Sequence, residues 1–320
     1  MSHGLREPTT IGAWPARSAI RKRRRWPDPK SGPADCGYRR QTPPNNRWRF
    51  FVLPEDVTMA IVDTHCHAGL LKYEPVESLL RHMQVSGVEQ AVLIQYAGNT
   101  DNEYLVDCLS RFPGKLAAAM IVPEDDDGTA VRQWADRGIQ GIRLALKARA
   151  KPTDGLAQWR AAAETGLVVS APCRPAWLLS SEFFEVVDTF PDLAIVIEHL
   201  GGIGADAAPP YDEFRSALEG LSGRPNVSMK LPGFGEFCRV PMPFEPIPPL
   251  ARMALDAFGP QRLMWGSDYP PVSSREGYDN SLRVPMEYFA DLSETDRSAI
   301  FGDTARAIWQ LPDDLPVVTA

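Results

Sequence analysis

The sequence lacks several features that would assign it to a common class of protein. No apolar run approaches the roughly 18 residues of a membrane-spanning helix. Neither of the glycine-rich phosphate-binding patterns, GxGxxG and GxxxxGK[ST], is present. The five cysteines form no CxxC pair, which argues against a disulfide framework and a structural zinc site. We therefore expect a cytoplasmic protein with no membrane partner.

Charge is unevenly distributed along the 320 residues, although 44% hydrophobic residues indicate an ordinary globular chain. Residues 1–58 hold 12 Lys and Arg against 5 Asp and Glu, together with eight prolines. The remaining residues hold 22 basic against 36 acidic side chains. The first segment predicts a disordered basic extension, because it cannot bury enough apolar surface to offset the entropy of ordering. The acidic remainder, 59–320, argues against nucleic acid as a partner.

The basic extension has several interpretations. No apolar stretch follows the basic run at 21–25, so a secretory signal is not indicated. A transit peptide and a nucleic-acid-binding arm both remain open. We favour upstream sequence joined by a wrongly assigned start, because Met59 directly precedes the first convincing strand. A chain that begins at Met59 is then expected to fold and act like the whole.

From Met59 onward, short apolar runs alternate with helical patterns, which is typical of a parallel sheet with crossover helices. Eight strands in about 250 residues predict an α/β fold of the (β/α)8 TIM-barrel type, here a distorted one. An open doubly wound sheet would need a glycine-rich loop after its first strand. The predicted strands are 60–63, 90–95, 116–121, 138–144, 167–170, 194–198, 227–230 and 263–266.

Histidines and an aspartate follow these predicted strands. His65 and His67 come after the first strand, His199 after the sixth and Asp268 after the eighth. In a (β/α)8 barrel such positions meet at one mouth, where active sites are built. His65 and His67 are two apart on extended chain, so both side chains point the same way. Three imidazoles and a carboxylate are a zinc-type ligand set.

Four motifs give the chain a resemblance to the amidohydrolase superfamily: DTHCH at 63–67, IEHLGG at 197–202, WGSDYP at 265–270 and IFGDTAR at 300–306. They are most similar to the amidohydrolase-related branch, and the resemblance covers about residues 60–312. That branch contains lactonases, among them 2-pyrone-4,6-dicarboxylate lactonase, and non-oxidative decarboxylases. The resemblance implies a distorted TIM barrel.

The chain departs from the branch at the end of its fifth strand. Many members carry a metal-binding histidine there, and Pro172 occupies that position. The fourth strand offers no bridging ligand, so a binuclear centre is not expected. One divalent metal, zinc above all, remains open for the three histidines and Asp268. Metal-independent catalysis, as the lactonase group implies, also remains open, and Cys173 is either a replacement ligand or a buried small residue.

Roles follow for the candidate residues. Asp268 is expected to act as general base towards water. His65, His67 and His199 would bind the metal or stabilise the developing oxyanion. By resemblance Arg143 holds a substrate carboxylate. Further candidates for the substrate pocket are Lys230, Arg275, Cys173, Tyr96, Glu236 and Tyr269.

The expected function is therefore a hydrolase that opens a small carboxylated lactone or ester. A metal-dependent decarboxylase of the same branch is the first alternative, although the missing strand-five histidine weighs against it. A non-catalytic partner subunit of an active paralogue is the second. The protein partner therefore remains open: it is either a second copy of this chain, in a homodimer, or such a paralogue.

Overall fold

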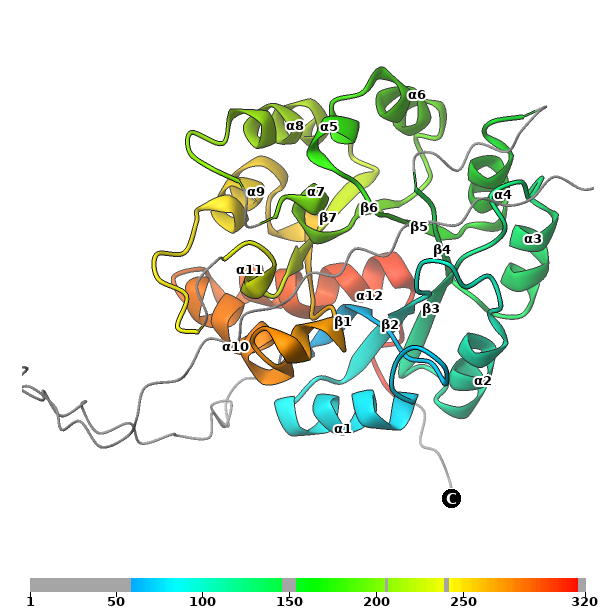
Figure 1. Ribbon diagram of the computed structural model, residues 1–320, viewed down its shortest axis with the longest axis horizontal. Helices are drawn as coiled ribbons and strands as arrows, with labels where there is room; N and C mark the ends of the chain where they lie inside the picture. Colours follow the sequence, from blue (N-terminus) through cyan, green and yellow to red (C-terminus); the bar gives the residue numbers. More distant parts are fainter. Residues whose placement is uncertain (1–58, 146–153, 205–206, 239–241, 316–320) are drawn as a thin grey trace, which may run out of the picture. The chain divides into compact units, whose positions relative to one another are not determined.

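The computed structural model describes residues 59–145, 154–204, 207–238 and 242–315. These residues form eight parallel strands paired in chain order into a nearly closed barrel, with helices between them, as Figure 1 shows. The predicted fold class is thereby confirmed. The predicted basic extension at 1–58 lies outside the described residues. The strands are β1 (Val62–Cys66), β2 (Gln90–Ile94), β3 (Leu116–Met120), β4 (Gly141–Arg143), β5 (Val168–Ala171), β6 (Ile195–Ile197), β7 (Val227–Pro232) and β8 (Leu263–Gly266).

Helices surround the strands in Figure 1. Two of them end at a glycine, since Gly87 and Gly166 adopt the left-handed conformation just past a helix. The α-helices are α1 (Val76–Ser86), α2 (Glu103–Arg111), α3 (Thr129–Asp136), α4 (Ala157–Thr165), α5 (Pro175–Leu178), α6 (Ser181–Thr189), α7 (His199–Gly202), α8 (Asp212–Ser222), α9 (Leu250–Phe258), α10 (Tyr278–Tyr288), α11 (Glu294–Ser298) and α12 (Thr304–Trp309). Shorter 3₁₀ or π turns are η1 (Phe234–Glu236), η2 (Pro260–Arg262), η3 (Pro271–Ser274) and η4 (Ala299–Asp303).

The barrel interior is apolar at one end. Inward-facing side chains of β1, β2, β3, β5, β6 and β8 pack with Ala305 and Trp309 of α12, and Trp309 is 1% exposed. Side chains alternate between the two faces of a strand, so the next inward-facing position lies two residues nearer the carboxyl end of each strand. In β5 this position is Ser170, and in β7 it is Lys230. A polar layer therefore separates the apolar floor from the mouth.

The seam between β1 and β8 closes at the mouth. The backbone N–H of Asp268 donates to the His65 carbonyl at 2.7 Å, and that of His67 donates to the Tyr269 carbonyl at 2.8 Å. β1 continues to Cys66, with an irregular register between Asp63 and Cys66. His65 thus lies inside the strand, because β1 ends three residues beyond the predicted end at Asp63. The described residues contain no helix that is both long and apolar enough to cross a membrane.

Candidate active site

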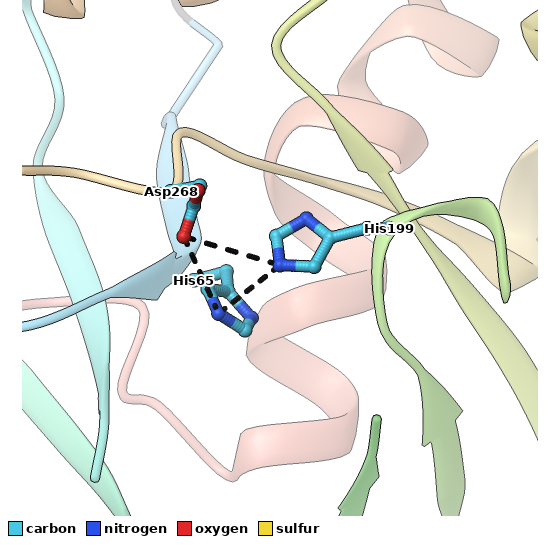
Figure 2. Close-up of side chains that lie close together, drawn as sticks. All are labelled: His65, His199 and Asp268. Carbon is cyan, nitrogen blue, oxygen red and sulfur yellow. Dashed lines mark hydrogen bonds and ion pairs between the residues drawn. The ribbon is translucent and has the colours of Figure 1, made fainter. Parts of the chain in front are cut away.

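Three predicted site residues converge at the barrel mouth (Figure 2). The Nε2 atoms of His65 and His199 lie 3.3 Å apart. Asp268 Oδ1 lies 3.8 Å from the Nε2 of His65 and 4.0 Å from that of His199. One ligand atom from each residue falls within 4.8 Å of the others. The predicted ligands from the first, sixth and eighth strands therefore meet.

Two of these residues have a backbone conformation that non-glycine residues rarely adopt. His199 has a φ of 46° and Asp268 a φ of 58°. Non-glycine residues in the left-handed region are uncommon and concentrate at functional sites. After His199, Gly202 has a φ of 71°, and a Cβ there would lie 2.2 Å from the Cys173 carbonyl oxygen. Glycine is thus required where the loop after β6 passes the loop after β5.

Asp63 fixes the position of His65 and Asp268. Its carboxylate accepts hydrogen bonds from the Ser267 backbone at 2.8 Å, the Ser267 hydroxyl at 2.7 Å and the Tyr278 hydroxyl at 3.0 Å. It is fully buried, and burial raises its pKa while these hydrogen bonds lower it. Asp63 therefore joins β1 to the end of β8 beneath the mouth.

The fourth predicted ligand, His67, has a defined hydrogen-bond pattern. Its Nδ1 lies 2.6 Å from the Ile94 carbonyl oxygen, which can only accept, so the ring hydrogen is on Nδ1 when His67 is neutral. The lone pair on Nε2 then faces Asp268 Oδ1 at 3.5 Å. Two acceptors facing each other call for a proton or a cation between them. A histidine that donates its other N–H to a carbonyl is typical of metal sites, so these residues fit a metal ion.

Burial sets the charges of the group. It lowers the pKa of His65 well below the ordinary value, and it lowers the pKa of His199 to about 4 against the opposing effect of Asp268. Burial works to raise the pKa of Asp268, but the contact with His67 and the charge interaction with His199 hold it at about 2. At neutral pH, the neutral imidazoles of His65 and His199 thus face an ionised carboxylate. That carboxylate can accept a proton from water.

Arg275 connects Asp268 to a second carboxyl group. Its guanidinium contacts Asp268 Oδ2 at 3.4 Å and Glu236 Oε1 at 3.0 Å. Burial, together with the charge of Asp268, raises the pKa of Glu236 to about 7, although Arg275 opposes the shift. Arg275 is thus already paired, and its predicted contact with a substrate stays a prediction.

Arg143 is paired as well. Its Nε and Nη2 donate to the Glu198 carboxylate at 3.0 and 2.6 Å. Ser170 donates to Glu198 Oε1 at 2.7 Å. Burial acts to raise the pKa of Glu198, but Arg143 and Lys230 hold it at about 2. Side-chain exposure of 16% leaves Arg143 open to the mouth, so its predicted role towards a carboxylate stays a prediction.

The profile of the amidohydrolase family matches residues 62–311, which is most of the chain and contains every residue of this site. The protein belongs to the amidohydrolase family. The matched range begins at the first residue of β1 and ends beyond α12, so it coincides with the barrel.

Three proteins illustrate what this amidohydrolase is similar to. It is 27% identical over 222 residues to a 4-sulfomuconolactone hydrolase of Rhizobium radiobacter, covering 66% of this chain and 70% of the relative. It is 37% identical over 166 residues to an L-fucono-1,5-lactonase of Burkholderia multivorans, covering 43% and 55%. A solved structure from Pseudomonas putida, described as a 2-pyrone-4,6-dicarboxylic acid hydrolase, is 26% identical with a TM-score of 0.65, covering 80% and 99%. The chain spans 43% to 70% of the length of its curated relatives.

The remaining predicted residues of this amidohydrolase lie in different surroundings. Tyr96 lies at the mouth, where its ring packs edge-on against Tyr73 at 5.4 Å. Tyr269 is 1% exposed, and its hydroxyl donates to Glu74 at 2.6 Å. Cys173 is buried, and burial raises its thiol pKa. Among the described residues it is not part of the group that could hold a metal.

Sequence reasoning missed Tyr73, Lys72 and Ser170. Tyr73 stacks on His67 with ring centroids 5.1 Å apart, and the Lys72 ammonium lies 5.2 Å from the Tyr73 and Tyr96 rings. Both follow the DTHCH motif by a few residues, and an aromatic beside a cation in that loop was the available signal. Ser170 could have been found from its inward parity in β5.

Glu276 makes a separate prediction about stability. It is 6% exposed, its Oε2 accepts from the Gly235 backbone at 3.0 Å, and burial raises its pKa from 4.5 to about 7. Between these values the folded protein keeps a proton that the unfolded chain releases, so the free energy of unfolding falls as pH rises. Glu276→Gln removes this loss.

We expect the stability difference between Glu276→Gln and wild type to grow between pH 4.5 and 7 by roughly 3 kcal/mol, since one pKa unit is about 1.4 kcal/mol. Urea unfolding at several pH values measures it. Glu287→Gln, at an exposed glutamate that forms a surface ion pair with Arg283, is the matched control, and its difference should change by no more than about 1 kcal/mol. A constant difference for Glu276→Gln would contradict the assignment.

Proposed function

We propose that this amidohydrolase opens a small carboxylated lactone with water activated at the barrel mouth. One observation carries the proposal: Asp268 Oδ1 lies within 4.0 Å of an imidazole nitrogen of His65, His67 and His199. Relatives named for lactone hydrolysis, and the structural similarity to a pyrone-dicarboxylic acid hydrolase, support the same class. The reaction breaks the acyl C–O bond and adds one water.

Asp268 is the general base in this proposal. It is 8% exposed, ionised at neutral pH and held by Arg275 through Oδ2, which leaves Oδ1 to face the imidazoles. The water proton passes to Oδ1 as the water oxygen attacks the lactone carbonyl carbon. The proton is then available to the leaving alkoxide. An imidazole N–H at 3 Å or so from the carbonyl oxygen would stabilise the charge that develops there.

The residues that would hold a metal are His65, His199 and Asp268, with His67 beside them. Nitrogen and oxygen donors of this kind suit zinc, and three protein ligands plus water is the usual count of a catalytic zinc site. When bound, such an ion lowers the pKa of water and polarises a carbonyl group. We propose zinc as the metal of this chain.

Substrate carboxylates would be recognised by the cations at the mouth. Arg143 presents a guanidinium that is 16% exposed and is held in place by Glu198. Guanidinium groups bind carboxylates in a bidentate manner. Lys72 lies between β1 and α1, with its ammonium 5.2 Å from the rings of Tyr73 and Tyr96, and Tyr73 stacks on His67.

The direct test is turnover of the purified full chain. A panel would pair carboxylated lactones with uncharged sugar lactones, and each with its open-chain methyl ester, in the presence of zinc and of a chelator. We expect carboxylated lactones to open, which a pH indicator follows because each turnover releases one acid. Failure on every lactone with zinc present would contradict the proposal, and release of CO₂ from carboxylated aromatics would favour decarboxylation.

A further inference from the structure

Lys230 occupies an unusual place for a lysine. It lies on β7 at an inward position, it is fully buried, and its ammonium is 5.6 Å from the ring of Trp309 on the barrel floor. Lysine is almost never fully buried unless it is paired. Its Nζ contacts Ser170 Oγ at 2.9 Å and His65 Nδ1 at 3.2 Å. The side chain therefore lies beneath His65 and not in the open mouth.

The hydrogen bonds around Lys230 have a direction that Glu198 fixes. Arg143 donates two hydrogen bonds to Glu198, at 3.0 and 2.6 Å, and a carboxylate paired with a guanidinium in this way can only accept. Ser170 must therefore donate its hydroxyl hydrogen to Glu198, at 2.7 Å. Its oxygen is then free to accept, and Lys230 donates to it at 2.9 Å. The chain of donors thus runs from Lys230 through Ser170 to Glu198.

The same ammonium faces His65. An ammonium has three hydrogens and no acceptor, so Nδ1 of His65 must accept the hydrogen bond at 3.2 Å. A neutral imidazole has one ring hydrogen, and in His65 that hydrogen is then on Nε2. His67 has the opposite arrangement, because its Nδ1 donates to the Ile94 carbonyl oxygen. The two histidines of the DTHCH motif thus differ in which nitrogen carries the hydrogen.

We propose that Lys230 is a positioning residue that holds His65 in the tautomer with its hydrogen on Nε2. In the metal-free protein, His65 then presents a hydrogen-bond donor to the mouth, where it meets Asp268, His199 or the carbonyl oxygen of a substrate. The use of this donor in catalysis rests on the proposed lactone hydrolysis; the tautomer itself does not.

The assignment has a consequence for metal binding. A metal ion at His65 Nε2 needs the lone pair of that nitrogen, and in this tautomer a hydrogen occupies it. Binding must displace the hydrogen against the contact with Lys230. Lys230 therefore weakens the metal site that His65, His199 and Asp268 form. Groups behind a metal ligand typically change metal affinity 10- to 100-fold.

The test is histidine ¹⁵N NMR of the full-length chain freed of metal by a chelator, with the His65 signals assigned from a His65→Gln variant. In wild type we expect the Nε2 of His65 to have the chemical shift of a protonated nitrogen and Nδ1 that of an unprotonated one. Lys230→Met should abolish this preference and tighten Zn²⁺ binding by about 10-fold, measured by calorimetry. Lys230→Arg keeps a pure donor and should retain the wild-type tautomer.

Lys72→Met is the matched control, because it removes another cation close to the histidines without touching His65. It should leave the tautomer unchanged and shift zinc affinity less than Lys230→Met does. A hydrogen on Nδ1 of His65 in wild type overturns the proposal even if no variant folds. Equal zinc affinities for the two Met variants would also overturn it. Neither measurement depends on turnover. Failure of the lactonase proposal can therefore be told apart from failure of this one.

Discussion

Asp268→Asn should reduce kcat by about 10³-fold while the protein stays folded, since a general base typically contributes 10²- to 10⁴-fold. The amide has nearly the shape of the carboxylate and can still contact Arg275 and the mouth through its oxygen. It cannot take a proton from water. The wild-type pKa of about 2 means that the carboxylate is ionised at every pH suited to an assay. The loss should therefore be similar from pH 5 to 8.

Steady-state kinetics on the best lactone of the panel measures this effect, and circular dichroism checks the fold. Asp192→Asn, at an exposed aspartate before β6, is the matched control and should keep wild-type turnover. A larger change in KM than in kcat would indicate that Asp268 binds substrate and does not activate water. Retention of turnover would remove Asp268 from the chemistry.

Glu198→Ala should lower the free energy of unfolding by about 3–5 kcal/mol, because it leaves the partly buried Arg143 and the buried Lys230 without their counter-ion. Glu198 is 2% exposed and accepts from Arg143 and from Ser170, which in turn accepts from Lys230. Its loss leaves the buried Lys230 and the partly buried Arg143 next to neutral groups. Stabilities of 5–15 kcal/mol are usual, so this is a large fraction of the total.

A double variant tests the cause. Replacing both members of a buried ion pair by apolar groups is often close to neutral, so Glu198→Leu combined with Arg143→Met should recover much of the stability that Glu198→Leu alone loses. Denaturant unfolding of the four proteins of the cycle gives the coupling energy. Additive effects would mean that the pair does not interact. The exposed pair Arg132 and Glu164 is the matched comparison and should couple by no more than about 1 kcal/mol.

The sequence predicted the eight strands and the meeting of His65, His199 and Asp268 because both depend on local patterns. Apolar runs give strand positions, and in a barrel every strand end faces one mouth. The end of β1 was misplaced, since the hydrogen bonds from Asp268 and His67 across the seam extend it, and no local pattern contains them.

The pairing of charges could not be predicted in the same way. Arg143 and Glu198 are 55 residues apart, and Lys230 and Ser170 are 60 apart. All four are polar residues on or next to barrel strands, so the sequence presents them alike. Side-chain packing alone decides which cation faces substrate and which faces another side chain. Burial also sets the protonation of Glu236, which the sequence presents as one more acidic residue.

The seam between β1 and β8 joins residues that are far apart in sequence and are therefore synthesised at very different times. Asp63 and Ser267 are separated by 204 positions, so a ribosome must synthesise nearly the whole barrel before the two can meet. Contacts of such long range form late and slowly. Catalytic competence should therefore arise in a single late step, because a nascent chain that ends before β8 has the histidines of the site but lacks Asp268, the proposed base.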